Sequence, residues 1–464
     1  MPVIACKFGG SSVATSQKME QIVKILKLNP ERKAVILSAP GKADSAATKV
    51  TDYLISITQK SLAGKDIKKD VADVKQRYYD IYEPLGLARA TINSVLSRLD
   101  ERIAANKNNA EKYRDAIVAS GEDLNAELFA IYAKTVGINA KFVSPMDIEL
   151  IVTADFGDAR VKSEGNANLI KLRDHIADGY VVVFPGFFGV SADKDIVTFS
   201  RGGSDLTGAL VAAAIDAYEY ENFTDVNGIL STNPKTVCNP EQIKALTYRE
   251  MRELSYMGFS VFHEEAVKPV MKKKIPIRLR NTDNLENEGT LIVSDRLPKQ
   301  ENAIVGIAAA SGFCSFNLQK FLMNREKGFG RKLLQIFEDL GYSYEQCPSG
   351  VDNISVVLSQ KQLSSEGVNN IMRLMEKELK PDDLKTEYDL SLVAVVGEGL
   401  RNQIGVLGAA ANALAKSGVN IKLVNQGSSE LSIVFGVSTA DETCAVKALY
   451  EKFFIKKEKK EKGK

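Results

Sequence analysis

ACKFGGSSVA, residues 5–14, is the stretch that decides how the first part of the chain is interpreted. A short apolar run is followed by a lysine, an aromatic residue, two glycines and two serines. Lys7 ends the predicted strand, and the glycine pair lets backbone N–H groups converge. With Ser11 or Ser12 opening the predicted helix SQKMEQIVKILK, these features form an anion site at a helix N-terminus. A glycine turn followed by a serine N-cap needs no ligand and fits the same residues.

Strand-like apolar runs alternate with amphipathic helical stretches over the first 300 residues, which predicts α/β layering. Several of these runs are continuously apolar, as is typical of strands covered on both faces. The predicted strands are VIACKF (3–8), KAVILSA (33–39), NAKFVS (139–144), YVVVFPGF (180–187), YENFTDV (220–226) and IPIRLRNT (275–282).

The segment 58–118 differs from its surroundings, because it is charged, apolar at helical spacing and interrupted by Pro84-Leu85-Gly86. This pattern predicts a helical excursion from the sheet domain. A lid or an oligomer contact is one interpretation of the excursion. A packed helical hairpin is the other.

The C-terminal third contains an internal repeat, which begins after a polar, proline-containing boundary at 288–306. Each copy predicts a small βαββαβ sandwich, with a glycine as the left-handed cap after its first helix. Such units leave a strand edge exposed and tend to pair side by side. Four positions recur at an offset of 77 residues: Gly328 and Gly405, Gly341 and Gly418, Gly350 and Gly427, and Ser355 and Ser432.

The composition argues against several classes of protein. Lys and Arg total 61 and Asp and Glu total 59, and the resulting net charge of +2 does not indicate a nucleic-acid partner. Two histidines and five scattered cysteines, with no C-x-x-C, predict neither a metal site nor a disulfide framework. No signal-like N-terminus or long apolar run occurs, so we expect a cytoplasmic protein without a membrane partner. Residues 456–464 are expected to be a solvated, charged tail.

A second glycine pair gives the same physical arrangement further along the chain. In TFSRGGSDLTGALVAAAI, Arg201 precedes the glycines, and Ser204 and Asp205 open a long apolar helix. Arginine offers a planar fork that suits a carboxylate or phosphate, whereas a serine or aspartate cap on a buried helix needs no ligand. In ASGEDLNAELFAIYAK, Glu122 lies at another helix start, where it either complements the helix dipole or binds a substrate ammonium.

Other phosphate-binding signatures are absent from the sequence. There is no G-x-x-x-x-G-K-[ST], no G-x-G-x-x-G after a strand, and no H-R-D with D-F-G. The ordered set KFGGSSVA, LSAPG, SGE, FPGFFG, RGGSD, TDVNGI and GFSVFHEE, followed by paired small repeats, resembles the aspartokinase family over nearly the whole chain. The resemblance implies a monofunctional enzyme of the α/β class. Its amino-acid-kinase fold would have a central, mostly parallel sheet between helices, followed by two ACT domains.

The resemblance also implies domain boundaries. The catalytic domain would cover 1–296, including the excursion, with a first ACT region at 303–380 and a second ACT domain at 388–455. In relatives one ACT unit is often inserted into the other, so AIVGIAAA (303–310) would then belong to the second unit.

The implied reaction fits the scarcity of histidine. Aspartokinases transfer the γ-phosphoryl group of MgATP to the β-carboxylate of L-aspartate, giving 4-phospho-L-aspartate at the start of lysine, threonine and methionine biosynthesis. A carboxylate with a pKa of ~3.9 is already ionised at neutral pH, so the reaction needs no general base. Catalysis then depends on aligning the two substrates and on neutralising the charge of the moving phosphoryl group.

Site roles follow from the resemblance position by position. Lys7 would be the principal transition-state cation, with Arg201 and Asp205 as further catalytic residues. ATP and Mg²⁺ are the implied cofactors, and no metal-ligating residue is predicted. The implied ATP-binding residues are Lys7, Gly9, Gly10, Ser11, Thr224, Asp225, Lys235 and Ser260. The implied aspartate-binding residues are Ser38, Thr51, Glu122 (facing the ammonium), Phe187 and Arg201 (on the α-carboxylate).

The first repeat resembles the family's effector-binding copy, with lysine as the implied feedback inhibitor and threonine as the alternative. Pairing of the ACT domains implies a homodimer or homotetramer. The implied effector-binding residues are Met323, Gly328, Phe329, Gly330, Ser343, Glu345 and Asp352.

Two motifs depart from the family's pattern. The family's GAKVLHP is replaced by GFSVFHEE in this chain, so Ser260 stands where a nucleotide-contacting lysine is usual. The family's TDPR is replaced by TNPK, which introduces Asn233 and puts Lys235 where an arginine is usual. An amino-acid-sensing regulator with a degraded kinase domain is therefore one alternative function. Another amino-acid kinase, such as a glutamate kinase, is a second.

Overall fold

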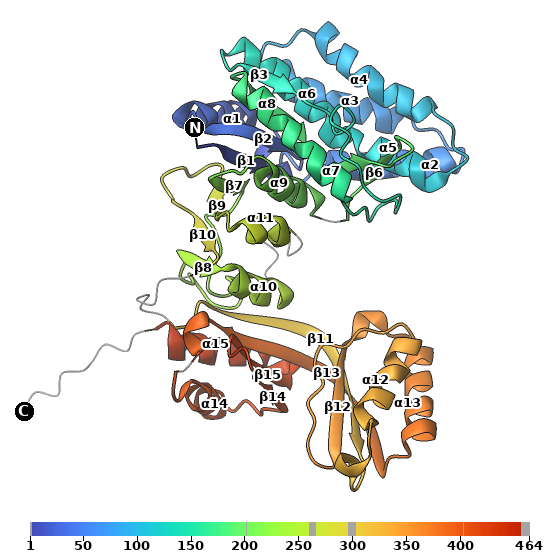
Figure 1. Ribbon diagram of the computed structural model, residues 1–464, viewed down its shortest axis with the longest axis vertical. Coiled ribbons are helices and arrows are strands. Elements are labelled where there is room, and N and C mark those ends of the chain that lie inside the picture. The colour runs from blue at the N-terminus through green and yellow to red at the C-terminus, as the bar shows by residue number, and fades with distance from the viewer. Residues whose placement is uncertain (1, 201, 259–265, 296–302, 402, 456–464) are drawn as a thin grey trace, which may run out of the picture. The chain divides into compact units, whose positions relative to one another are not determined.

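The computed structural model describes residues 2–200, 202–258, 266–295, 303–401 and 403–455, which form two compact units (Figure 1). The first unit comprises the described residues of 1–229, 244–248 and 260–296, and the second comprises those of 230–243, 249–259 and 297–464. Two predicted site residues, Arg201 and Ser260, lie outside the described residues, as does the predicted tail at 456–464. Among the described residues, no helix is long and apolar enough to cross a membrane.

The first unit is built on an eight-stranded sheet, in which all neighbours are parallel except β9 and β10. All six predicted strands overlap strands of this sheet, which confirms the predicted α/β class. The buried apolar runs within β1, β2 and β4 are the reason these strands could be recognised from the sequence. In spatial order the strands are β3 (Ala140–Phe142), β4 (Val181–Pro185), β2 (Arg32–Leu37), β1 (Ile4–Phe8), β7 (Glu219–Thr224), β9 (Ile277–Asn281), β10 (Thr290–Val293) and β8 (Ala245–Thr247).

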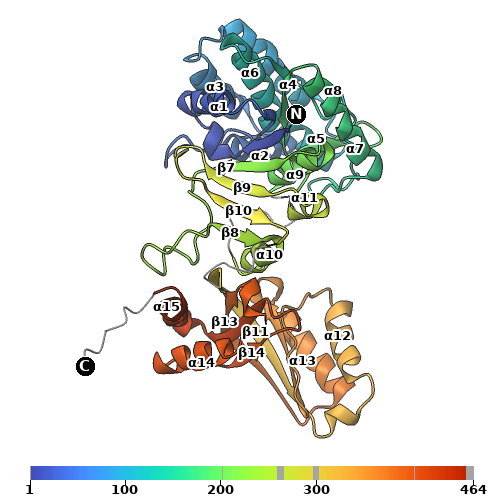
Figure 2. The same cartoon turned by 60° about the vertical axis from the view of Figure 1, so that its left-hand side comes forward.

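Helices cover both faces of this sheet (Figure 2). The side chains of Ile4, Cys6 and Phe8 join the large core that also contains residues of α1 (Ser16–Leu28) and α6 (Ser120–Thr135). Helix α9 (Gly203–Ala214) packs against β1, β2 and β7. Because side chains alternate along a strand, Lys7 points to the face opposite that of Cys6 and Phe8. Two short strands, β5 (Phe188–Val190) and β6 (Ile196–Thr198), form a separate hairpin beside the sheet.

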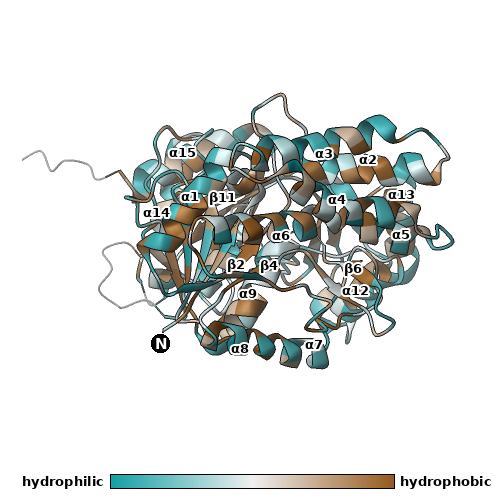
Figure 3. Ribbon diagram, turned by 90° about the horizontal axis from the view of Figure 1, so that it is seen from above, coloured by the Kyte–Doolittle hydropathy of each residue, from teal (hydrophilic) through white to brown (hydrophobic). Residues whose placement is uncertain are grey.

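The excursion predicted at 58–118 is a layer of packed helices. Its apolar side chains, including Val74, Tyr78 and Tyr82, are buried in the same core as the strands β1 and β2. In Figure 3, α3 and α4 carry hydrophilic and hydrophobic residues side by side, as amphipathic helices do. The packed hairpin is thus the interpretation that the structure supports. The helices are α2 (Val50–Leu62), α3 (Lys68–Tyr82), α4 (Arg89–Ala104) and α5 (Ala110–Val118).

The second unit contains an antiparallel sheet that both repeats share. Its strands lie in the order β12 (Asn353–Ser359), β11 (Gly306–Gln319), β13 (Asp383–Val396), β15 (Ser432–Ser438) and β14 (Leu423–Asn425). The two longest strands, β11 and β13, each pass through both repeats, because one half of each strand belongs to each hydrophobic core. Ile304 and Ile307 pack in the core of the second repeat, so the segment 303–310 lies with that repeat.

Each repeat adds two helices to the shared sheet. The first repeat has α12 (Phe329–Asp339) and α13 (Ser365–Leu379), and the second has α14 (Val406–Lys416) and α15 (Glu442–Phe453). The glycines after the first helix of each copy, Gly341 and Gly418, have φ values of 76° and 73°. This confirms the predicted left-handed caps, a conformation in which a Cβ would clash.

Candidate active site

The loop after β1 differs from the predicted helix start. Gly10–Val13 form a 3-10 helix, and α1 begins only at Ser16, with Thr15 as the N-cap whose hydroxyl accepts the Lys18 N–H at 3.3 Å. The prediction that Ser11 or Ser12 opens α1 was therefore wrong. Ser12 is buried instead, with its Oγ 2.6 Å from Thr282 Oγ1 on the loop after β9.

The loops after β1 and β2 are in close contact. The Gly41 N–H donates to Gly10 O at 2.9 Å. A Cβ on Gly41 would lie only 2.7 Å from the carbonyl carbon of Gly10, and a Cβ on Gly10 would lie 3.1 Å from Ala39 O. Glycine is thus required here by the approach of two backbones. The two loops, 9–14 and 38–42, form one surface at the carboxyl ends of adjacent parallel strands.

Lys7 lies at the centre of this edge. Its Nζ is 2.6 Å from Asp205 Oδ1, and the side chains of Lys7 and Asp205 are only 10% and 15% exposed. Asn222, the strand partner of Lys7 on β7, donates from Nδ2 to the same Asp205 oxygen at 2.9 Å. The sequence did not single out Asn222, although a polar residue inside a buried strand is an available signal.

The RGGSD loop positions Asp205 in the first turn of α9. Gly202 is the N-cap of this helix and has a φ of 85°, with no side-chain hydrogen bond at the cap. The expected serine or aspartate cap was therefore wrong, because a left-handed glycine makes the turn instead. Gly186, directly after β4, allows the backbone at the end of that strand to lie close to α9, because a Cβ on Gly186 would be 2.7 Å from Ser204 Oγ.

Glu122 is a buried carboxylate on the first turn of α6. Glu122 is 5% exposed, and its Oε2 has no hydrogen-bond partner among the described residues. Burial raises the pKa of Glu122 from 4.5 to about 8, although backbone amides and the charge of Lys7 act in the opposite direction. Only Oε2 is left without a partner, so a cation brought by a ligand could pair with Glu122 and stabilise its ionised form.

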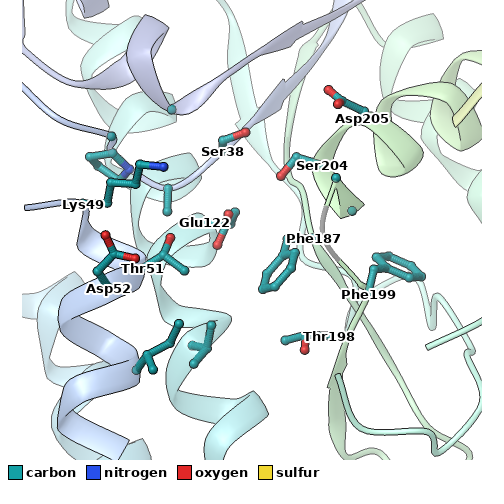
Figure 4. Close-up of a pocket in the computed structure, with 18 of the residues that line it drawn as sticks. Ser38, Lys49, Thr51, Asp52, Glu122, Phe187, Thr198, Phe199, Ser204 and Asp205 are labelled. Atoms are coloured by element: carbon teal, nitrogen blue, oxygen red, sulfur yellow. The ribbon is translucent and has the colours of Figure 1, made fainter. Parts of the chain in front are cut away.

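These elements surround a cavity of about 1180 Å³ in the first unit (Figure 4). It lies beyond the carboxyl ends of β1, β2, β4 and β7, the usual place for ligands in open α/β sheets. Figure 4 shows Glu122, Thr51 and Ser38 on one side of it and Phe187 with Phe199 across from them. The predicted site residues that line it are Lys7, Gly10, Ser11, Ser38, Thr51, Glu122, Phe187, Asp205 and Asp225.

Three described residues of the predicted ATP-binding set do not line the cavity. Gly9 lies beside it, and a Cβ there would be 3.4 Å from Lys7 Nζ. Thr224 ends β7, and its hydroxyl donates to Asp225 at 3.1 Å. Lys235 belongs to the 230–243 segment of the second unit, where its N–H donates to Asn233 at 3.0 Å.

Phe187 and its neighbours explain how the far wall is formed. Phe187 has a φ of 78°, an unfavourable conformation for a non-glycine residue. Its N–H donates to Thr207 Oγ1 at 3.1 Å, and its carbonyl accepts the Phe199 N–H at 2.8 Å. Strained backbone that is held by specific hydrogen bonds is typical of functional sites.

Several cavity residues were missed by the sequence analysis. Lys42 and Lys49 follow the LSAPG motif, and Arg114 and Val118 come from the end of the excursion. Arg114 is held by Asp115, a fully buried carboxylate that also accepts the N–H groups of Gly157 and Thr198 at 2.8 Å. Cations near a predicted anion site were the available signal for the two lysines. Nothing local in the sequence indicated Arg114.

The predicted effector residues lie in the first repeat of the second unit. Met323 and Phe329 are buried in its core, while Gly328 precedes α12 with a φ of 76°. Asp352 accepts the Leu322 N–H at 2.9 Å, which ties this turn to the loop before β12. The remaining three residues are Gly330, Ser343, whose N–H donates to Gln362 at 3.0 Å, and Glu345, whose N–H donates to Val357 at 2.8 Å.

Comparison with known proteins agrees with this architecture. Residues 2–281 match the amino acid kinase family, and residues 393–453 match an ACT domain. Over 448 residues the chain is 46% identical to aspartokinase 3 of Bacillus subtilis (strain 168), and the match covers 97% of this chain and 98% of that protein. The chain belongs to the aspartokinase family. It is therefore an aspartate kinase, an enzyme that uses ATP, and its length is that of the monofunctional members.

Solved structures of aspartokinases have the same fold. The aspartate kinase of Clostridium acetobutylicum, described as an allosteric enzyme, superposes with a TM-score of 0.85 at 36% identity and covers 97% of this chain and 100% of that chain. Aspartokinase III of E. coli in complex with aspartate and ADP (R-state) has a TM-score of 0.77 at 22% identity, with 97% and 100% coverage. The same E. coli protein with lysine and aspartate (T-state) has a TM-score of 0.74 at 22% identity, with 97% and 99% coverage.

Proposed function

We propose that the cavity at the carboxyl edge of the sheet is where the γ-phosphoryl group of ATP is transferred to the β-carboxylate of L-aspartate. The observation that carries this proposal is the arrangement of Lys7, Asp205 and Glu122, whose Oε2 has no hydrogen-bond partner among the described residues, around one cavity. A buried cation can neutralise a moving phosphoryl group, and a buried carboxylate with a free oxygen can bind an ammonium. No general base is required, because the acceptor carboxylate is already ionised.

In this mechanism the ATP phosphates lie against the loops 9–14 and 38–42, with Lys7 next to the transferred group. In the structure Lys7 is held by Asp205, so its Nζ is already directed to one point before substrates bind. When a phosphate approaches, the Asn222 amide continues to hold Asp205, which leaves Lys7 free to share its charge with the phosphate. Preorganised charge of this kind lowers the barrier because little reorganisation is needed during the reaction.

L-Aspartate would bind between Glu122 and the wall formed by Phe187. Glu122 would bind the ammonium group, and Ser38 and Thr51, on the same side of the cavity, would contribute hydroxyl groups from the loop after β2 and from α2. Arg201, from the RGGSD motif, is proposed for the α-carboxylate. With the ammonium held at one end, the β-carboxylate can be directed toward Lys7, and this positioning is the main catalytic contribution of the pocket.

Mg²⁺ is proposed as the partner of the nucleotide. Within the described residues no group of three or more His, Cys, Asp and Glu side chains could hold a metal ion. Mg²⁺ in phosphoryl-transfer sites is usually bound by phosphates and one or two carboxylates, and Asp225 and Asp205 at the cavity could supply these. When bound, the ion would neutralise negative charge on the phosphates.

For regulation we propose that lysine binds the first repeat, with threonine as the alternative effector. Glu345 is the group that we assign to a lysine ammonium, because it is an acidic side chain whose partial burial raises its pKa, and a bound cation would offset that cost. Exposed apolar side chains on the same repeat, Phe321 and Val351, support a homodimer or homotetramer formed through the ACT region. A cytoplasmic location is part of the same proposal.

A hydroxamate assay with ATP, Mg²⁺ and L-aspartate tests the reaction directly. Formation of an acyl-phosphate, trapped as the hydroxamate, is expected with aspartate and not with glutamate as the acceptor. Absence of any acyl-phosphate from the folded, purified protein would contradict the proposal and favour a sensing protein with a degraded kinase domain.

A further inference from the structure

Polar side chains of one helix of the excursion, α3 (Lys68–Tyr82), contact the loops after β1 and β2. Arg77 donates from Nη2 to two backbone carbonyls, Ala14 O at 3.2 Å and Gly41 O at 3.0 Å. Ala14 ends the loop after β1, and Gly41 lies in the loop after β2. One guanidinium nitrogen therefore joins the two loops that form the proposed phosphate surface.

Two further residues of α3 contact other parts of the site. The Tyr78 hydroxyl donates to Gly121 O at 2.9 Å, directly before Glu122. The Tyr82 hydroxyl contacts the Asn125 side chain at 2.8 Å, and Asn125 in turn donates to Ser38 O at 2.8 Å. Side chains of one helix thus reach the loops that carry Gly10, Ser38, Gly41 and Glu122.

The environment of Arg77 indicates that these contacts are its main interactions. No ion pair joins Arg77 to any residue that the structure describes, and its buried Nε has no hydrogen-bond partner there. The aromatic residues beside it on α3, Tyr78 and Tyr82, are fully buried, so the helix itself is fixed in the core. Arg77 is partly buried and its Nε is shielded from solvent, so the two carbonyl contacts are the hydrogen bonds that hold its guanidinium in place.

We infer that Arg77 is a positioning residue, which locks the loops 9–14 and 38–42 together so that their backbone is preformed for the nucleotide phosphates. The inference rests on the proposed function, because it assigns those loops to ATP. It gives the excursion a role beyond core packing: α3 determines the geometry of a site that it does not line. Tyr78 has the corresponding role for Glu122 on the aspartate side.

Steady-state kinetics of R77M, R77K and Y78F, with both substrates varied, test the inference. R77M removes both donors but keeps the aliphatic stem. Displacing a loop by about 1 Å can reduce rates by ten- to a hundredfold, so we expect kcat/KM for ATP to fall by at least about tenfold, with KM for aspartate changed by less than about twofold. R77K, with a shorter donor, should lie between R77M and the unmodified enzyme. Y78F should raise KM for aspartate about threefold and leave KM for ATP unchanged.

R89M is the matched control. Arg89 belongs to the same excursion, but its side chain is 59% exposed, pairs with Glu83 and lies over the Tyr79 ring. Its removal should leave the kinetics with both substrates unchanged. Calorimetric titration of ADP into R77M should show a weaker affinity by a similar factor to the change in KM for ATP.

Unchanged kcat/KM for ATP in folded R77M would overturn the inference. Equal losses toward ATP and aspartate, accompanied by a lower melting temperature, would also overturn it, since they indicate a general structural role. If R77M does not fold, the kinetics of R77K decide the question. An unchanged kcat/KM for ATP in R77K overturns the inference, and a several-fold loss of kcat/KM confined to ATP supports it.

K7M is measured in parallel. If K7M keeps full turnover, the proposed assignment of the site fails, whereas a loss in K7M without one in R77M refutes only the role of Arg77.

Discussion

The two glycine pairs of the catalytic unit look alike in sequence but differ in structure. In the RGGSD motif, Gly202 adopts a φ of 85° and α9 begins directly after it, with Asp205 in the first turn. In the KFGGSS motif, Gly9 has an ordinary φ of −70°, a 3-10 helix follows, and α1 starts only at Ser16. The glycine pair of RGGSD is needed for a left-handed turn. The glycine pair of KFGGSS is needed because Gly10 contacts the backbone of another loop at Gly41.

The difference shows that a glycine motif can have two separate physical causes. A left-handed glycine stabilises a local turn, so its replacement mainly affects folding. A glycine at a close approach of two loops depends on both loops, so its replacement shifts one loop against the other. Only the second kind couples the loop after β1 to the loop after β2, and through Gly41 to Arg77.

The largest effect is expected for Lys7→Met, which removes the charge that we propose lies next to the transferred phosphoryl group. We expect kcat to fall by about 10² to 10³, with a small change in KM for aspartate, because the charge acts mainly in the transition state. The measurement is the steady-state rate with both substrates varied. Lys18→Met is the control, since Lys18 lies near the same loop but pairs with Asp283. An unchanged kcat in K7M would refute the role of Lys7.

The comparison of the two glycine pairs is tested by Gly41→Ala against Gly202→Ala. The Cβ of G41A would meet the Gly10 backbone at 2.7 Å, so the two loops must separate. We expect kcat/KM for ATP to fall by about tenfold or more with a small loss of stability. G202A should instead lower the free energy of unfolding by about 1 kcal/mol through strain at positive φ, with a smaller kinetic effect. Gly64→Ala, at a φ of 68° and with open space around it, is the control for the strain alone. Equal kinetic losses in G41A and G202A would remove the distinction.

A change of intermediate size is expected for Glu122→Gln. If Glu122 binds the substrate ammonium, KM for aspartate should rise about tenfold, the effect of losing one hydrogen bond to a charged group. In the unmodified enzyme, kcat/KM for aspartate should increase with pH toward about 8, as Glu122 ionises, and this slope should disappear in E122Q. Glu127→Gln, on the same helix but paired with Arg98, is the matched control.

The same variant has a predicted effect on stability. The pKa of Glu122 is raised from 4.5 in the unfolded chain to about 8 in the folded protein, so the unfolded state binds fewer protons between these values. Stability of the unmodified enzyme therefore falls as the pH rises from 4.5 to about 8. E122Q lacks this loss, so its melting temperature relative to the unmodified enzyme should increase over that range and level off above it. A constant difference would contradict the raised pKa.

The smallest effect on turnover is expected for Glu345→Ala in the first repeat. Inhibition by lysine, expressed relative to the variant's own uninhibited rate, should be weakened or lost. Glu345 is a cleaner test than Asp352, because Asp352 also accepts the Leu322 N–H and its removal would disturb that turn. Undiminished inhibition by lysine in E345A would place the effector elsewhere, and a panel with threonine and methionine would then be measured.

The sequence by itself predicted six of the eight strands of the first sheet and the order of the motifs, and it singled out Lys7 as the residue to test. Those strands are recognisable because a strand that is buried on both faces forms a short, continuous apolar run. Such a run is a local pattern, so it can be seen in the sequence without knowledge of the fold. The repeated glycines of the C-terminal third were equally visible, since a left-handed cap is a property of one residue and its neighbours.

The tertiary structure alone decided where α1 begins, why Gly10 and Gly41 are glycines, and which residues of the excursion matter. Ser12 was available as a helix cap, but the buried contact with Thr282, 270 positions away, holds it elsewhere. Arg77 reaches Ala14 and Gly41 across 63 and 36 positions. Contacts of this kind depend on the order of strands in the sheet and on the packing of α3 against α1, α2, α4 and α6. No local pattern encodes them, because the residues involved are neighbours only after the chain has folded.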